Sequence, residues 1–131
     1  MSRYLTSSLH IPGPYIPLTL SETYDQLGSM MLGAPTFADD LFPELDVDTE
    51  FQALVGGFDN VRKKLGEECY AALIDLAARA KALFADDLDD SNGKTSQGRA
   101  LLYEMEDIIQ SVRSKRVRAK QPDDDGEVTG D

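Results

Sequence analysis

The chain has 131 residues, of which 24 are acidic and 13 are basic, so its formal net charge is −11. This length fits one domain, and 41% hydrophobic residues are enough to form a core. The negative charge argues against binding to nucleic acid or to an anionic membrane, because both need a basic surface. One cysteine excludes an internal disulfide, and one histidine excludes a site with two imidazoles.

The first eighteen residues predict an extended arm. Pro12, Pro14 and Pro17 fall here, and proline fixes φ and lacks a backbone N–H. This stretch has no apolar run long enough for a signal peptide, and no window of the chain is apolar enough to span a membrane. We therefore expect a cytoplasmic protein.

Two helices are predicted after the arm. Thr19 and Glu22 form a capping-box pattern that opens a helix near 20–32. A connection over residues 34–47 follows, and we expect its Phe37 and Phe42 to pack on the core; anchoring a partner, as Tyr15 could also do, is the alternative. The second helix is expected to begin after Asp46 or Asp48 and to end at Gly66. Its apolar stripe consists of Phe51, Leu54, Val55, Phe58, Val61 and Leu65.

A glycine pair interrupts the second stripe. Gly56 and Gly57 together cost about 2 kcal/mol in a helix relative to alanine. Such a pair indicates close helix–helix packing, a kink or a surface that a partner contacts, and close packing is the commonest of the three.

Two more helices complete the predicted domain. The third runs from Glu67 to about residue 85, and an acidic loop over 86–93 follows it. Thr95 or Ser96 is expected to cap the fourth, which can continue as far as Gln121. Its apolar stripe consists of Leu101, Leu102, Met105, Ile108, Ile109 and Val112.

These elements predict an all-α, four-helix single domain, with an arm over 1–18, a helical domain over 19–113 and a charged C-terminal tail over 114–131 that is expected to be disordered from Asp123. The tail is nearly neutral, so ten of the eleven negative charges belong to residues 1–113. Its basic residues are interpreted as cations that complement the dipole at the end of the last helix. They are Lys115, Arg116, Arg118 and Lys120.

Catalytic and metal-binding patterns are not found in the sequence. When Gly93 is placed at the invariant sixth position of an EF-hand loop, Leu88 and Arg99 occupy the first and twelfth positions, which should be acidic. Carboxylate pairs such as Glu67 and Glu68 fall on polar faces or in loops, where nothing tunes their pKa values. We therefore expect no enzyme, no metal and no cofactor.

The layout resembles the small cytosolic immunity proteins that bacteria keep against toxins of contact-dependent and type VI systems. Two segments carry the resemblance: residues 10–31, which begin His-Ile-Pro-Gly-Pro-Tyr, and residues 98–109, which begin Gly-Arg-Ala-Leu-Leu-Tyr. The resemblance implies an inhibitor of one cognate toxin with no catalysis of its own. The alternative is an acidic secretion chaperone or adaptor for an effector, although such chaperones usually contain a substantial sheet. A homodimer is left open.

An acidic surface is the predicted binding feature, because carboxylates attract a basic partner over long range and can occupy the places of phosphates. The expected partner is therefore a protein toxin or effector, with no nucleic acid and no membrane. The candidate binding residues are Asp39, Asp40, Glu44, Asp46, Asp86, Asp87, Asp89, Asp90, Glu104 and Asp107.

Overall fold

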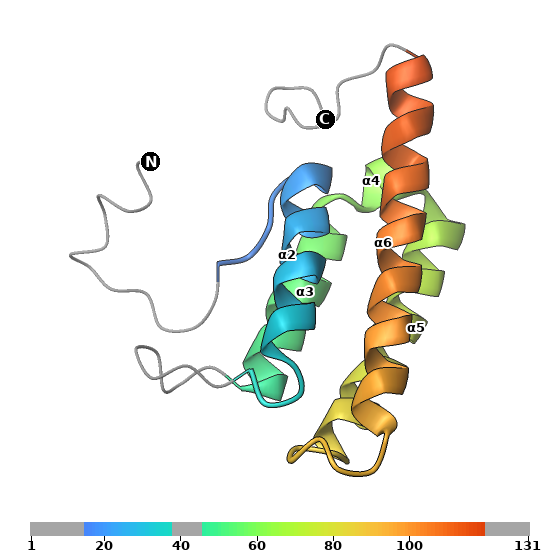
Figure 1. Cartoon of the computed structure of the whole chain (residues 1–131). Coiled ribbons are helices and arrows are strands. Elements are labelled where there is room, and N and C mark those ends of the chain that lie inside the picture. Colours follow the sequence, from blue (N-terminus) through green and yellow to red (C-terminus); the bar gives the residue numbers. More distant parts are fainter. Residues whose placement is uncertain (1–14, 38–45, 120–131) are drawn as a thin grey trace, which may run out of the picture.

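The computed structural model describes residues 15–37 and 46–119, and every regular element in these two stretches is a helix (Figure 1). The all-α prediction is therefore confirmed for this part of the chain. The first fourteen residues of the predicted arm, Phe42, and the end of the tail from residue 120 lie outside the described residues. The helices are α2 (Leu20–Gly33), α3 (Val47–Asn60), α4 (Arg62–Leu65), α5 (Glu67–Ala85) and α6 (Lys94–Arg118).

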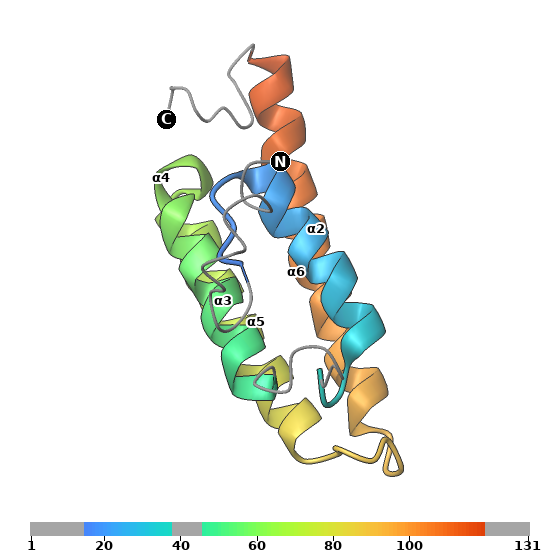
Figure 2. The same ribbon diagram turned by 90° about the vertical axis from the view of Figure 1, so that its left-hand side faces the viewer.

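The four long helices form a bundle. Helix α6 packs against both α5 and α2, and α3 packs against both α5 and α2 (Figures 1 and 2). Apolar stripes from all four helices meet in one core, as the amphipathic pattern requires. Its largest fully buried side chains include Phe58, Phe84, Leu27, Leu73 and Leu102.

The described helices number five because the predicted second helix is broken. Val61 leaves helical geometry (φ −110°, ψ 16°) and separates α3 from α4. Gly, Asn and Val are all weak helix formers. The break follows a turn that contains Gly57, Asn60 and Val61. Val61 and Leu65 both remain in the core, with 1% and 6% of their surfaces exposed.

Side-chain caps begin α2 and α3. The Thr19 hydroxyl accepts a hydrogen bond from the Glu22 N–H (3.0 Å), as predicted, but the Glu22 carboxylate accepts from Leu18 N–H (2.9 Å) and so lies one residue outside the predicted box. Asp46 caps α3. It exchanges reciprocal hydrogen bonds with Thr49, which stabilise the first turn.

The glycine pair of α3 is covered by residues 15–18, which have no regular secondary structure. A Cβ on Gly57 would lie 3.0 Å from the Pro17 ring, and a Cβ on Gly56 would lie 3.0 Å from the Ile16 side chain. The Asn60 side-chain amide donates to the Pro17 carbonyl oxygen (2.7 Å). The close approach is therefore made by an extended segment of the same chain, and not by a helix.

Phe37 packs into the core, as predicted. Its ring lies 6.0 Å from that of Phe51 and 5.6 Å from that of Phe84, both nearly perpendicular to it. Its backbone is in the left-handed region (φ 58°). The Arg99 guanidinium holds the preceding turn by donating to the carbonyl oxygens of Met31 (3.1 Å) and Ala34 (3.2 Å).

Helix α6 differs from the prediction at its start and ends within the predicted limit of Gln121. It begins at Lys94, after Gly93 in the left-handed region (φ 86°), so neither Thr95 nor Ser96 is its cap. Thr95 is fully buried in the first turn. At the other end, the helix continues to Arg118, and the domain boundary expected at residue 113 falls inside it.

Candidate functional site

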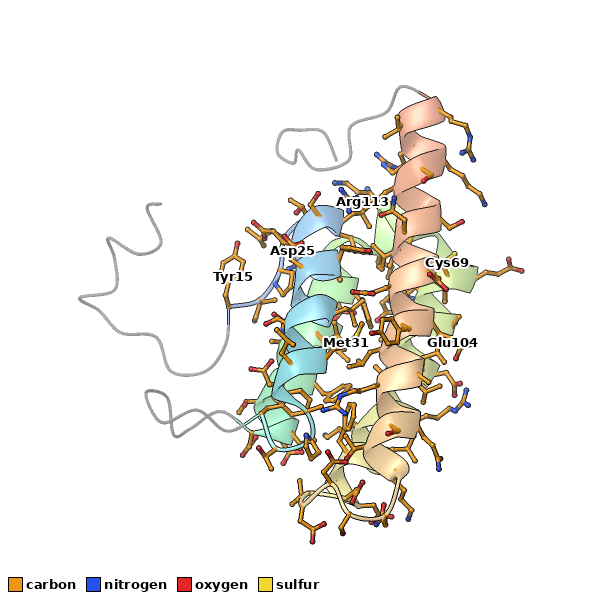
Figure 3. The ribbon with its side chains drawn as sticks, in the orientation of Figure 1. Tyr15, Asp25, Met31, Cys69, Glu104 and Arg113 are labelled. Atoms are coloured by element: carbon orange, nitrogen blue, oxygen red, sulfur yellow. The ribbon has the colours of Figure 1, made fainter. Side chains whose placement is uncertain are left out.

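The structure separates the ten predicted binding residues into groups. Asp39, Asp40 and Glu44 lie outside the described residues. The four aspartates of the 86–93 loop lie at one end of the bundle, where α3 also begins with Asp46 (Figure 1). Glu104 and Asp107 lie elsewhere, on the middle turns of α6, and Figure 3 shows Glu104 on the side of α6 remote from α2.

Asp87 is a structural residue of the loop. Only 1% of its surface is exposed, and its carboxylate accepts hydrogen bonds from the N–H groups of Ser91 (2.8 Å), Asn92 (3.1 Å) and Thr95 (2.9 Å). Burial acts to raise the pKa of this carboxyl group, but its backbone donors outweigh burial and lower the pKa to about 2. The carboxylate therefore caps α6 from inside the fold and does not face a partner.

Most of the other carboxylates at this end are already engaged. Asp86 forms an ion pair with Lys94 (2.8 Å), and Asp89 accepts a hydrogen bond from the Ser91 hydroxyl (2.7 Å). Asp46 is exposed but is used in the cap of α3. Asp90 is exposed at a positive φ of 55°. The loop presents less available charge than its composition suggests.

The middle of α6 carries a more open acidic surface. We call Tyr103, Glu104 and Asp107 the α6 acidic face, because Asp107 follows Tyr103 by four residues and Glu104 by three, and residues three and four apart lie together on a helix. Tyr103 is 59% exposed, and Glu104 and Asp107 are also exposed. Glu106 is half-buried towards α2, where a Cβ on Gly28 would lie 3.5 Å from its carboxylate oxygen.

Few cations offset this face. Helix α2 contains no lysine or arginine, and α6 has none between Arg99 and Arg113. Arg99 points at backbone carbonyls of the α2 end, and the Arg113 guanidinium lies 5.5 Å from the Tyr24 ring centroid, turned towards α2 (Figure 3). The pKa of Glu106 is raised by its burial and by the neighbouring charge of Asp107, which indicates a negative local potential.

Tyr103 and Glu106 are absent from the predicted binding residues. The apolar stripe of α6 provides a signal for Tyr103, since position 103 falls opposite Leu101, Met105 and Ile109 on a helix and must face solvent. Nothing in the sequence signals the placement of Glu106, because it depends on Gly28 of another helix.

The described residues contain no group of three or more His, Cys, Asp or Glu side chains that could hold a metal ion. A groove between α3 and α5 has Phe51 and Ala77 among its lining residues, and Asp59 and Lys81 as its charged ones. Asp59 accepts from the Tyr70 hydroxyl, and Lys81 pairs with Asp48 (3.1 Å), so both already have structural partners.

Comparison with known proteins leaves the site to be interpreted from its own geometry. The chain gave no match to protein-family models, to curated proteins or to solved structures. Within residues 15–37 and 46–119, no helix combines the length and the apolar character needed to cross a membrane.

Proposed function

We propose that this protein is a non-enzymatic binding protein that neutralises a cognate bacterial toxin, and that the α6 acidic face is its main contact. The supporting observation is an exposed tyrosine beside two exposed carboxylates, with no lysine or arginine on α2 or on the adjoining turns of α6. Tyrosine is enriched among the residues that dominate binding energy, and carboxylates steer a basic partner towards it. A toxin that acts on phosphate-bearing substrates has such a basic surface.

The carboxylates of the 86–93 loop are a secondary contact in this proposal. Asp89 and Asp90 remain exposed there, whereas Asp87 is buried and Asp86 is paired. The loop therefore supplies long-range attraction, and Tyr103 supplies the buried anchor once the partner is in place.

The experiment is a capture from native cells with the tagged protein, followed by mass spectrometry and a growth assay in which the captured protein is expressed with and without this chain. We expect a toxic protein whose toxicity is relieved by the wild-type chain. Tyr103→Ala and the double variant Glu104→Gln/Asp107→Asn should each weaken binding at least about tenfold.

The matched control is Asp89→Asn/Asp90→Asn, which removes the same charge from the loop and should weaken binding much less. An equal loss in this control would contradict the assignment to α6. Capture of a secreted effector that stays soluble and active in the complex would favour the secretion-chaperone function instead.

A further inference from the structure

Two basic runs that are far apart in the sequence lie at the same end of the bundle. Residues 62–64 form α4, residues 113–118 form the last turns of α6, and α4 contacts α6. Both lie at the end opposite to the acidic 86–93 loop (Figures 1 and 2). We call this surface the basic end. It holds seven of the eleven lysines and arginines of the described residues: Arg62, Lys63, Lys64, Arg113, Lys115, Arg116 and Arg118. Arg62 is already paired with Glu67 (2.8 Å) and lies over the Tyr70 ring, so the basic end depends on the remaining cations.

The α6 part of the basic end has no acidic residue of its own. No Asp or Glu occurs from Ile108 to Ala119, and the last turns of α6 extend beyond the ends of α2 and α3 (Figure 2). Lys115 and Arg118 are exposed. Dipole complementation explains cations in the last turn of one helix, but it does not explain two basic runs at the same end of the bundle.

An exposed apolar side chain lies among these cations. Val117 is 66% exposed, and it lines a shallow depression together with Gln110, Arg113, Ser114 and Arg118. The depression therefore combines two arginines, a glutamine and a serine with a valine. The Arg113 guanidinium also donates to the Gln110 side-chain oxygen (3.5 Å) and lies over the Tyr24 ring, whereas Arg118 is exposed. Guanidinium groups bind carboxylates in paired hydrogen bonds, and an apolar centre with a polar rim is typical of protein contacts.

We propose that the basic end binds an acidic protein segment in which carboxylates flank an apolar side chain. The valine favours a protein segment over a nucleic acid, because a phosphate backbone offers no apolar group to cover it. The net charge of −11 also repels a long polyanion, which extends over the rest of the molecule, more than it repels a short acidic segment. This surface is separate from the α6 acidic face, so the proposal does not depend on the toxin-binding function.

The test measures the fluorescence anisotropy of a labelled synthetic peptide of alternating glutamate and leucine with the full chain. We expect binding that weakens at least about tenfold when NaCl is raised to about 0.5 M, because exposed charges are then screened. Lys115→Glu/Arg118→Glu should weaken binding at least about tenfold, and Val117→Ser about threefold. Residues 123–131 add five acidic groups to the chain, and every variant keeps them.

The matched control is Arg79→Glu/Lys94→Glu, which changes the net charge equally at positions away from the basic end and should bind the peptide like wild type. Equal weakening in this control would overturn the proposal, and so would undiminished binding of a peptide with glutamine in place of glutamate. Tighter binding of single-stranded DNA or of phosphatidylserine vesicles than of the acidic peptide would also overturn it. Toxin capture should be unchanged in Lys115→Glu/Arg118→Glu, which separates the two proposals.

Discussion

The carboxylate of Asp87 satisfies three backbone N–H groups at or before the first turn of α6, where a helix has no internal acceptors. The Thr95 hydroxyl returns a hydrogen bond to the Asp87 carbonyl oxygen (3.2 Å). One aspartate thus closes the loop and caps the helix. In the sequence it is one of four aspartates among five residues, and only its burial distinguishes it.

Asp87→Ala should lower the melting temperature by about 5 °C at neutral pH, because it leaves those N–H groups without an acceptor. The pKa of Asp87 is lowered to about 2 in the folded protein, so its stabilising contribution is complete above the ordinary aspartate pKa of 3.8 and is lost as the pH falls towards 2. Thermal unfolding at several pH values measures both effects. A melting temperature of Asp87→Ala equal to that of wild type at neutral pH would contradict this role.

Two helical glycines give opposite expectations for alanine substitution. A Cβ on Gly98 would lie 2.5 Å from Cε1 of Phe84, a ring that is fully buried, so Gly98→Ala should destabilise the fold by about 2 kcal/mol. A Cβ on Gly28 would make an ordinary 3.5 Å contact with Glu106, so Gly28→Ala should stabilise by about 0.5 kcal/mol through helix propensity. Urea unfolding measures both changes, and equal effects of the two substitutions would contradict the packing around Gly98.

At the scale of elements, the contact between residues 15–18 and α3 depends on the glycine pair. The neighbour of Gly57 is the rigid Pro17 ring, whereas the neighbour of Gly56 is the side chain of Ile16, which is half exposed and can move. The two glycines therefore differ in function although they are adjacent.

Gly57→Ala should displace residues 15–18 from α3 and increase chymotryptic cleavage after Tyr15 several-fold, because cleavage follows local opening. The helix itself should persist, since alanine favours it by about 1 kcal/mol. Gly56→Ala is the control and should be cleaved like wild type. Circular dichroism should show the same helix content in both variants, and equal cleavage of both would argue against the Pro17 contact.

Local patterns predicted the helices well because apolar stripes and caps act within a few residues. The first predicted helix, 20–32, corresponds to Leu20–Gly33, and the third, from Glu67 to about 85, corresponds to Glu67–Ala85. Contacts across the chain were not predictable in this way. The acceptor that caps α6 lies eight residues before Thr95, and the segment that covers Gly57 lies forty residues before it.

Of the candidate site, only the abundance of acidic residues could be predicted from the sequence. Glu104 and Asp107 are candidate binding residues in the sequence, and both are exposed in the structure. Which carboxylates are buried or paired depends on packing, and so the sequence did not distinguish Asp87 from Asp89. The placement of two basic runs at the same end is likewise a property of the bundle, because α4 and the end of α6 are about fifty residues apart.

At the scale of the whole molecule, carboxylates with opposite pKa shifts set the response to acid. Burial raises the pKa of Glu50 above its usual 4.5, against a hydrogen bond from Gln26 (3.0 Å). Burial and Asp107 raise that of Glu106. A glutamate with a raised pKa in the folded state binds more protons there than in the unfolded state. The free energy of unfolding therefore increases as the pH falls from the raised pKa to the ordinary glutamate pKa of 4.5. The lowered pKa of Asp87 has the opposite effect, because its contribution to stability is lost as the pH falls towards 2.

The free energy of unfolding should therefore rise between neutral pH and about 4.5 and then fall as the pH approaches 2. Urea unfolding across this range measures the profile. Glu50→Gln/Glu106→Gln should flatten the rise and leave the fall at low pH, which belongs to Asp87 and to Glu67, whose pKa is lowered by its hydrogen bonds with Arg62. Greatest stability of the wild type at or above neutral pH would contradict this assignment of the two glutamates.

The short connection closed by Asp87 also has a kinetic consequence. Helices α5 and α6 form the most extensive helix pair of the described residues, and only residues 86–93 separate them. Forming this hairpin therefore costs little loop-closure entropy and gives a large contact area. We expect the hairpin to be formed in the folding transition state, while the contact of residues 15–18 with α3 forms later. Asp87→Ala should then mainly slow refolding, whereas Gly57→Ala should mainly accelerate unfolding.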